Sequence, residues 1–366
     1  MQVWDLPTRL FHWLLVGFVA AGLATGYIAP EWWMSPHVWA GYGIVVLVVF
    51  RLAWGVFGSE YSRVTTFAYS PGEVARHLRG LVMLRPSHHI GHNPTGAVMI
   101  FALIFVLVGI SVTGLLALGG EENQGPLAGV TGFQIGAAAK VAHGYLVNAL
   151  LVMVAGHVLG VIVESILCRE NLVRAMIKGN KRLPAGVPHP KPRKAHPVAA
   201  ALAIGVFVVP AGIVLGGLGR LPPSGLQALP VSADYRSECG DCHQVYHPSL
   251  LPAASWKGLM ENLDNHFGED ASLDEKTARG IESYLARYAS EAWGTEAANR
   301  FRIVSAKDPW RISATPYWVE KHSEIPESVF ARKDVGSKGN CAACHRDAAG
   351  GRFDDQMITI GKEKSS

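Results

Sequence analysis

Five long stretches of apolar residues constrain this chain more than any other feature of its sequence. Nearly uncharged runs cover residues 10–30, 37–57, 95–118, 141–163 and 197–219. An α-helix needs roughly 20 apolar residues to cross a lipid bilayer, so each run is long enough to span one. Because a helix satisfies its own backbone hydrogen bonds in hydrocarbon, this part of the chain is predicted to be all-helical and embedded in a membrane. The first run lacks a small-residue cleavage site, so we interpret it as a retained helix.

The distribution of charge predicts how these helices are oriented. Lys and Arg gather in segments 51–85 and 169–194, whereas segments 31–36 and 119–139 contain neither. By the positive-inside rule, the N-terminus faces the cytoplasm and the chain beyond the fifth helix lies outside. We therefore expect a protein of the bacterial cytoplasmic (inner) membrane with a periplasmic C-terminal domain. Membrane topology explains the basic residues, so no nucleic acid partner is expected.

Two short strings near the C-terminus have the form C-x-x-C-H. They are Cys239–His243, with Cys242 as second thiol, and Cys341–His345, with Cys344 as second thiol. In this pattern two thiols attach a haem covalently and the adjacent imidazole of His243 or His345 ligates its iron. One zinc site made of four thiolates is the alternative, but it leaves both histidines unexplained. The strings therefore predict two covalently bound c haems and a protein that transfers electrons.

Four histidines lie within the predicted membrane helices, namely His12, His37, His143 and His157. An ionisable side chain is costly in a bilayer and is therefore a functional candidate. His143 and His157 are 14 residues apart, which places them on one helix face about 21 Å from each other. With the predicted topology, His12 and His157 share the cytoplasmic depth, and His37 and His143 share the outer depth. Each pair predicts the ligands of one haem b iron; hydrogen bonding between helices is the alternative.

The C-terminal domain holds three further histidines that bear on the sixth ligand of each c haem. We assign His266 to the iron of His243, and His322 to the iron of His345. His247 follows His243 too closely to bind the same iron from the opposite face. It is expected at the surface or against a propionate, although it could also reach the second haem. Two imidazole ligands give low-potential haems suited to electron transfer.

Smaller signals concern local structure. Residues 220–233 have no periodicity and predict a linker, and Met260 is expected in the core. Ser272 and Glu275 have the spacing of a capping box that opens a helix through about Trp293. His77 lies in a basic segment and is expected to be solvated.

The N-terminal part resembles the bacterial cytochrome b561 family over residues 1–182. The strings that carry the resemblance are Val3–Trp13, Gly91–Gly96, His143–Tyr145 and Gly156–His157. The family includes b-type subunits of nickel-iron hydrogenases and formate dehydrogenases, and it implies a four-helix core, two b haems and quinone exchange. The fifth span lies outside the family pattern and is interpreted as a tether.

The same resemblance places a quinone near the cytoplasmic haem. His92 and Asn93 precede the third span on that side and could bond a quinone carbonyl. Helix capping by Asn93 ahead of Pro94 is the alternative, because Asn favours the cap position and Pro the first turn.

Residues 235–360 resemble the dihaem cytochromes c (DHC family). The resemblance is carried by the first haem string through Pro252, by His266–Gly268 and by His322–Pro326. It implies bis-histidine ligation and transfer to a soluble haem acceptor. Such proteins are commonly found with a membrane b cytochrome and a small haem protein.

The sequence thus predicts an all-α protein: a four-helix transmembrane haem b bundle, a fifth transmembrane tether helix and a small, mainly helical dihaem cytochrome c domain. The expected boundaries are 1–195 for the cytochrome b561-like membrane domain, 196–233 for the fifth helix and linker, and 234–366 for the periplasmic domain. The cofactors are two haem b, two covalently bound haem c, and quinone or quinol as exchangeable substrate.

We expect electrons to pass between the quinone pool and a soluble periplasmic haem protein. Residues 221–366 hold 21 Asp and Glu against 17 Lys and Arg, so a partner with a basic face is favoured. The alternatives are an anchor and conduit subunit of a hydrogenase- or dehydrogenase-like complex, and a superoxide:quinone oxidoreductase. The direction of electron flow and a homodimer are left open.

Overall fold

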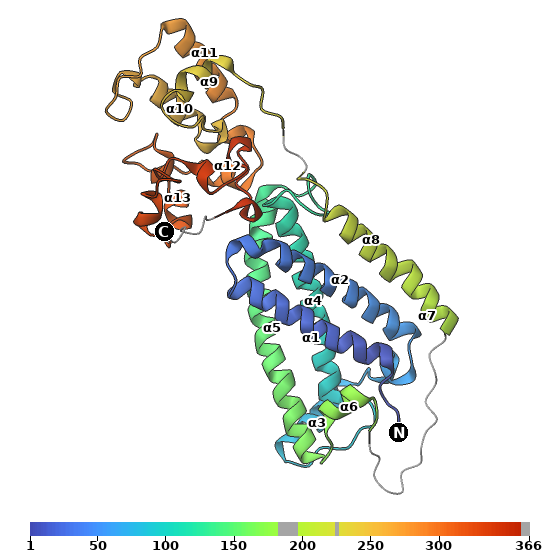
Figure 1. Cartoon of the computed structure of the whole chain (residues 1–366). Coiled ribbons are helices and arrows are strands. Elements are labelled where there is room, and N and C mark those ends of the chain that lie inside the picture. Colours follow the sequence, from blue (N-terminus) through green and yellow to red (C-terminus); the bar gives the residue numbers. More distant parts are fainter. Residues whose placement is uncertain (182–196, 224–226, 360–366) are drawn as a thin grey trace. The chain divides into compact units, whose positions relative to one another are not determined.

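The structure is a computed structural model and describes residues 1–181, 197–223 and 227–359 (Figure 1). Its secondary structure is helical, without a strand among these residues, which confirms the predicted all-α fold. Five helical segments are long and apolar enough to cross a membrane. They are Leu6–Tyr27 (α1), Glu31–Phe57 with α2 (Met34–Phe57), Pro94–Gly120 (α4), Phe133–Leu167 (α5) and Ala200–Leu218, which ends with α8 (Val209–Leu218).

Shorter helices accompany these spans. The amphipathic helix α3 (Pro71–Val82) lies between α2 and α4 in the chain, and α6 (Leu172–Lys178) follows α5. The fifth span begins with α7 (Pro197–Ala203) and passes through a π-helical turn, Ile204–Val208, before α8.

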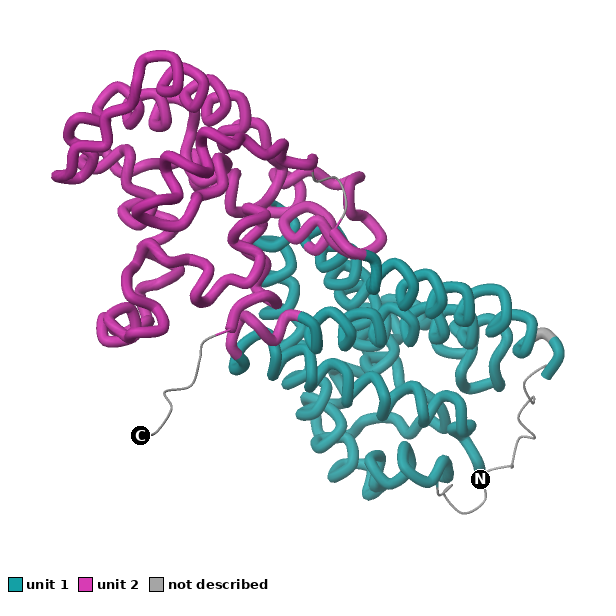
Figure 2. The backbone as a smooth tube through the Cα atoms, turned by 45° about the horizontal axis from the view of Figure 1, so that its top comes forward, with its two compact units in different colours: residues 1–29, 35–117, 138–221 teal, residues 30–34, 118–137, 222–366 magenta. Residues whose placement is uncertain are grey.

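The chain divides into two compact units that are interleaved in sequence (Figure 2). Unit 1 consists of Met1–Ala29, Ser35–Ala117 and Ala138–Leu221. Unit 2 consists of Pro30–Met34, Leu118–Ala137 and Pro222–Ser366. The connections after α1 and α4 therefore belong to the same unit as the C-terminal segment. The expected boundaries at 195 and 233 stay a prediction.

Four helices of unit 1 share one apolar core. Ile44 and Val48 of α2 pack with Leu107 of α4 and Leu150 of α5, and Phe18 of α1 joins them. Close approach depends on small residues here. A β carbon at Gly43 would lie 2.7 Å from the ring of Phe18, so only glycine lets α1 and α2 pack at this point.

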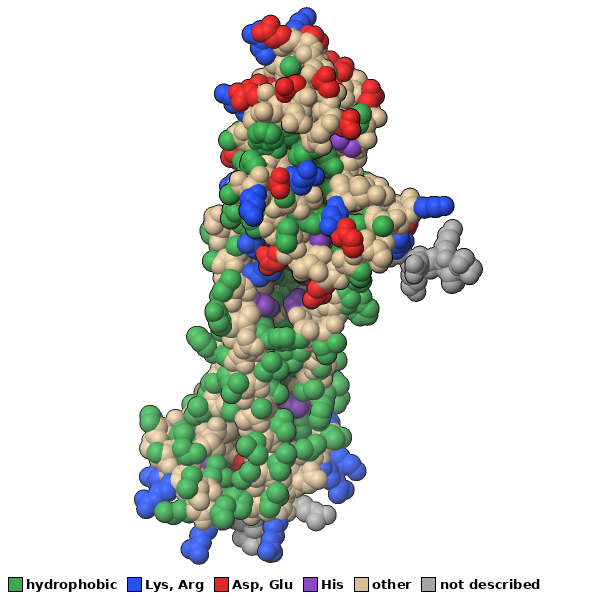
Figure 3. Space-filling view, turned by 90° about the vertical axis from the view of Figure 1, so that its left-hand side faces the viewer, with side chains coloured by type: hydrophobic (Ala, Val, Ile, Leu, Met, Phe, Trp, Pro, Cys, Tyr) green, Lys and Arg blue, Asp and Glu red, His purple; other side chains and the backbone are tan. Residues whose placement is uncertain are grey.

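The outer faces of these helices carry apolar side chains that the protein itself does not cover. Phe105 and Val152 are 77% and 74% exposed. Hydrophobic side chains dominate the visible face of the helices of unit 1 (Figure 3). Because burying this surface in lipid is favourable, the chain is a membrane protein.

A buried polar cluster fixes the beginning of α1. Asp5 is the N-cap residue and accepts from the Thr8 N–H at 2.9 Å, while its second oxygen accepts from Trp54 Nε1 at 3.0 Å. The Thr8 and Ser62 hydroxyls lie 2.7 Å apart. Arg51 is 6% exposed and donates to the Ser62 carbonyl at 3.0 Å. One carboxylate thus joins the start of α1 to the end of α2.

Unit 2 is built from short helices joined by 3₁₀ turns. The helices are α9 (Ala233–Gly240), α10 (Ala253–Met260), α11 (Glu275–Arg287), α12 (Glu296–Arg300), α13 (Pro316–Lys321) and α14 (Glu327–Phe330). Leu251, Trp256, Ile281 and Leu285 form its main core, and Met260 is buried with them as expected.

The predicted capping box at Ser272 is wrong. The N-cap of α11 is Asp274, whose carboxylate accepts from the N–H groups of Lys276 and Thr277, both at 3.1 Å. A carboxylate that reaches two free N–H groups caps the helix better than the hydroxyl two residues earlier. The helix ends at Arg287 rather than near Trp293.

Contacts within unit 2 hold the Leu118–Ala137 connection to the C-terminal segment. Arg300 forms an ion pair with the buried Glu121 at 3.3 Å. Gln124 donates to Asp354 at 2.8 Å. No pattern in the sequence indicates these pairs, because their partners are more than a hundred residues apart in the chain.

We predict that Asp5→Ala lowers the stability of the protein by about 1–2 kcal/mol, because the cap and the Trp54 bond are both lost. Asp5→Asn is the matched control, since its amide oxygen still caps the helix. Unfolding followed by circular dichroism in detergent measures the difference. Equal stability of the alanine variant and the native protein would show that this cluster does not fix α1.

Candidate haem sites

The histidines expected at the outer depth of the membrane lie opposite each other in unit 1. The ring centroids of His37 (α2) and His143 (α5) are 6.2 Å apart. Two imidazoles that share one metal through bonds of about 2 Å place their centroids roughly 6 Å apart. The pair therefore fits a haem iron between the rings.

Hydrogen bonds set the protonation of both rings. The Thr25 hydroxyl donates to the Ala21 carbonyl at 2.7 Å, so it accepts from His37 Nδ1–H at 3.1 Å. His143 Nδ1 lies 3.0 Å from the Ile110 carbonyl, an acceptor, and therefore also carries a proton. Both rings keep Nε2 free as a metal ligand, and such outer partners orient metal-binding histidines.

Glycines beside these rings leave room for close helix packing. A β carbon at Gly26 would lie 3.3 Å from the His37 ring, and one at Gly114 would lie 3.2 Å from the His143 ring. Thr25 is a polar residue within an apolar span, and this is the sequence signal that could have revealed it.

The pair expected at the cytoplasmic depth is His12 (α1) and His157 (α5). The two side chains are near enough to interact electrostatically. His12 Nδ1 is buried and has no hydrogen-bond partner among the described residues. A buried polar atom of this kind normally finds a partner, so the site fits a group that uses this imidazole. His157 lies about 21 Å from His143 along α5.

Unit 2 contains two further facing pairs. The centroids of His243 and His266 are 6.2 Å apart with planes inclined by 27°. Those of His322 and His345 are 6.1 Å apart. Nδ1 of His322 bonds to the Trp318 carbonyl at 2.8 Å, and the two rings stack at 4.3 Å. The structure thus brings together the histidines assigned to each c haem, at spacings that fit an iron.

The thiols of both C-x-x-C-H strings are free. Burial raises the pKa of Cys239 to about 11 and also raises the pKa of Cys341 and Cys344. Across the described part of the chain, only Glu121, Glu122 and Glu296 bring three possible metal-ligand atoms close together. The four thiols therefore do not converge on one zinc ion.

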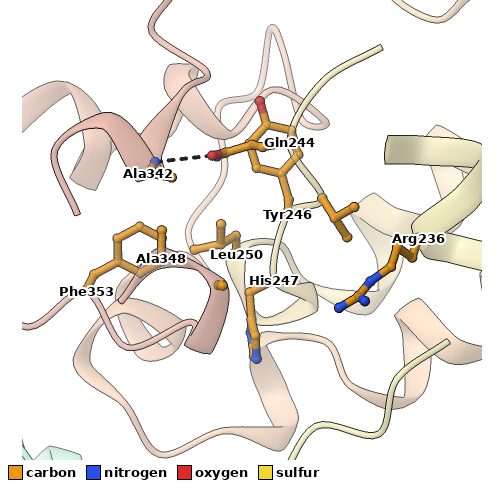
Figure 4. A pocket seen from close by; sticks show the side chains of 10 residues that line it. Arg236, Gln244, Tyr246, His247, Leu250, Ala342, Ala348 and Phe353 are labelled. Atoms are coloured by element: carbon orange, nitrogen blue, oxygen red, sulfur yellow. Dashed lines mark hydrogen bonds between the residues drawn. The ribbon is translucent and has the colours of Figure 1, made fainter. Parts of the chain in front are cut away.

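A cavity of about 280 Å³ lies between the two strings (Figure 4). Tyr246 and His247 line it from the first string's side, and Ala342 and Phe353 from the second. The Ala342 N–H donates to the Gln244 side chain at 3.2 Å. The segments that would carry the two c haems are therefore neighbours within unit 2.

The expectation of a surface position for His247 is wrong. Its side chain is 3% exposed and packs edge-on against Trp293 at 4.6 Å. Nδ1 accepts from the Ser249 N–H at 3.2 Å, so the ring caps the turn Pro248–Leu250. Burial lowers the pKa of His247 to about 4, and the ring is therefore neutral at pH 7.

Asn93 and His92 lie at the start of α4. Asn93 Oδ1 accepts from the Gly96 N–H at 2.6 Å, so this side chain does cap the helix. His92 packs against Trp4 at 4.5 Å and Phe67 at 4.9 Å, and burial lowers its pKa to about 3. Their role toward a quinone stays a prediction. His77, expected at the surface, is 3% exposed, because the amphipathic α3 turns it toward α4.

We predict that the stability of unit 2 falls as the pH drops from about 6.5 toward 4, by up to about 3 kcal/mol. The folded state keeps His247 neutral, whereas the unfolded chain binds a proton over this range. In His247→Asn the position cannot titrate, so the variant should lose this slope. Thermal unfolding of the full chain between pH 4.5 and 8, followed by near-ultraviolet circular dichroism, tests it. Parallel pH profiles for the two proteins would contradict the assignment.

Comparison with known proteins gives two matches to family models. The model for prokaryotic cytochrome b561 matches residues 3–179, and the model for dihaem cytochrome c matches residues 235–353. The probable Ni/Fe-hydrogenase 1 B-type cytochrome subunit of Escherichia coli is 27% identical over 213 residues, which cover 48% of this chain and 88% of that protein. A similar subunit of Cupriavidus necator is 26% identical, over 48% of this chain and 85% of its own.

Solved structures are similar to the C-terminal part. The crystal structure of DHC from Rhodobacter sphaeroides is 41% identical and covers 34% of this chain and 100% of its own, with a TM-score of 0.27. The dihaem cytochrome c of Shewanella baltica is 35% identical over 36% of this chain and 94% of its own, with a TM-score of 0.29. By the family models, residues 3–179 of the chain are similar to prokaryotic cytochrome b561 and residues 235–353 are similar to dihaem cytochrome c.

Proposed function

We propose that this protein carries electrons between the quinone pool and a periplasmic haem protein, using two b haems and two c haems. The observation that carries the proposal is the set of three facing histidine pairs with centroids 6.1–6.2 Å apart. Rings at this spacing fit six-coordinate iron, which favours electron transfer over catalysis on a bound ligand.

The chain's own residues would hold and orient the haems. In unit 1, His12 and His157 would bind the inner b iron, and His37 and His143 the outer one. The Nδ1 partners of His37 and His143 would fix the orientation of these two rings and leave Nε2 free to bind the metal. Bound haem supplies the one-electron redox chemistry.

In unit 2, His243 and His266 would bind one c iron, and His345 and His322 the other. The thiols of both strings would hold these haems covalently. Burial raises the pKa of Cys239 and Cys341 and so favours the neutral thiol before attachment.

The charge pattern supports a periplasmic unit 2. The connections Pro30–Met34 and Leu118–Ala137 contain no Lys or Arg and belong to unit 2 together with the C-terminal segment. Basic residues are instead concentrated in the connections of unit 1, which the positive-inside rule assigns to the cytoplasm. Asp and Glu gather on the visible surface of unit 2 (Figure 3), and an acidic surface favours an acceptor with a basic face.

A second candidate function comes from the relatives. Two of them are named as B-type cytochrome subunits of Ni/Fe hydrogenases. The alternative is therefore an electron-conduit subunit of a hydrogenase-like complex. Co-purification of a stable dehydrogenase partner from the native membrane would favour it over the proposed function.

We predict that anaerobic addition of a quinol reduces both the b and the c haems, which the α-bands report separately. Quinol oxidation at unit 1 would deliver electrons to both units of one chain. Reduction of the b haems alone would show that the units are not connected for electron transfer. No reduction of either set would overturn the quinol-oxidising function.

We predict that His143→Leu removes one b haem, because the outer iron loses a ligand. The b-to-c haem ratio should fall from about 1 to about 0.5, measured by the pyridine haemochrome spectrum. Thr113→Val is the matched control, since His143 keeps the Ile110 carbonyl as its Nδ1 partner. An unchanged ratio in His143→Leu would contradict the ligand assignment.

A further inference from the structure

A chain of hydrogen bonds in unit 1 joins α3, α4 and α5. Glu164 of α5 accepts from the Asn93 amide. The Thr95 hydroxyl donates to Asn93 Oδ1 at 3.0 Å, and Thr95 Oγ1 lies 3.0 Å from His77 Nδ1. His89 follows, with its ring centroid 5.3 Å from that of His77. These contacts exceed what capping α4 requires, because the cap needs only the bond from Gly96 to Asn93.

The direction of these bonds fixes the proton on His77. Because the Thr95 hydroxyl gives its proton to Asn93, it can only accept from His77, so Nδ1 carries the hydrogen. The lone pair of neutral His77 is therefore on Nε2. This atom is buried and makes no hydrogen bond within the described residues. Because His77 is only 3% exposed, bulk water does not reach the atom either. A buried nitrogen left unpaired is costly and calls for an explanation.

Glu164 is the second titratable group of this chain. Asn93 Oδ1 is occupied as an acceptor by Gly96 and Thr95, so its NH₂ group faces Glu164 and the carboxylate accepts. Glu164 lies seven residues beyond His157 on α5, a rise of about 10 Å toward the helix end.

Among the described residues, few other titratable groups act on His77 and Glu164. His77 interacts electrostatically with Glu164 and His89. Glu164 also acts on the thiol of Cys168, which Lys181 and Glu170 influence as well. Burial lowers the pKa of His77, so its Nε2 is unprotonated at neutral pH. His89 is half-buried, and its Nδ1 lies 3.0 Å from the Ser87 carbonyl.

We propose that Glu164 and His77 are the two proton acceptors for quinol oxidation at the Asn93 end of unit 1, and that His89 returns protons to solvent. The inference rests on the proposed function. When a quinol is oxidised, both of its O–H bonds break and two electrons leave to the electron-transfer path. One proton forms an O–H bond on the Glu164 carboxylate, and the other forms an N–H bond on His77 Nε2. Quinone reduction uses the same groups as donors.

Two conservative variants test this inference. Glu164→Gln keeps an oxygen that accepts from Asn93, and His77→Asn keeps an amide that donates to Thr95, but neither variant can take up a proton. His88→Gln is the matched control. His88 is a neighbouring histidine that lies outside this series of hydrogen bonds and contacts Glu170 at 3.5 Å. The full protein is purified with its haems, and haem content and the dithionite-reduced spectrum are checked in each variant.

The rate of b haem reduction by a quinol is then measured against pH. We expect each variant to lower the rate at least about tenfold, as loss of a general base does, and the control to leave it unchanged. The native rate should fall toward acid pH as His77 is protonated, at a pH below the ordinary histidine range because burial lowers the pKa of His77, and this fall should be absent in His77→Asn. Variants with native rates and a native pH profile would overturn the inference.

A second readout does not depend on turnover. Infrared difference spectra on quinone reduction and reoxidation should contain a protonated carboxyl band in the native protein that disappears in Glu164→Gln. If a variant loses haem, the test is the carboxyl band of the native protein alone. Absence of this band would overturn the inference. If quinol fails to reduce the native protein at all, the proposed function fails and this inference falls with it.

Discussion

An imidazole inside a membrane needs a partner for each of its ring nitrogens, and this constraint organises unit 1. Lipid offers no hydrogen bonds, so every buried polar atom must find its partner within the protein or a bound group. For His37 and His143 the Nδ1 atoms are satisfied by Thr25 and the Ile110 carbonyl. The Nε2 atoms remain free as ligands, and the spacing of the two rings fits an iron between them. The helices α1, α2, α4 and α5 must pack closely to achieve this, which explains the glycines beside these rings.

The same logic extends to the opposite depth of α5. His12 Nδ1 and His77 Nε2 are both buried without a hydrogen bond within the described residues, but their surroundings differ. His12 lies near enough to His157, its expected partner on the haem iron, to interact with it electrostatically. His77 belongs to a polar chain that includes Glu164 and Asn93, which suits proton transfer. A haem ligand, His157, and a proposed proton acceptor, Glu164, would therefore lie about 10 Å apart along one helix.

This arrangement has an energetic consequence for the proposed electron path. An electron that crosses from a cytoplasmic-side quinol to a periplasmic acceptor moves toward the positive side of the membrane. The potential favours this direction by about 2.3 kcal/mol per 100 mV for each charge that crosses fully. Quinone reduction by a periplasmic donor would run against it and conserve energy in the potential. The redox potentials of the donor and acceptor determine which direction the protein uses.

The sequence by itself determined the five membrane helices, the all-α class and the two family resemblances, because hydrophobic length and the C-x-x-C-H strings are local properties. It also named the histidines that the structure brings into facing pairs. A spacing of 14 residues, for example, places His143 and His157 on one face of their helix. Only the tertiary structure decided the burial of His247 and His77, the Thr25 and Thr113 contacts, and the attachment of the Leu118–Ala137 connection within unit 2. Burial and hydrogen-bond partners depend on which distant segments meet, and no periodicity along the chain encodes that.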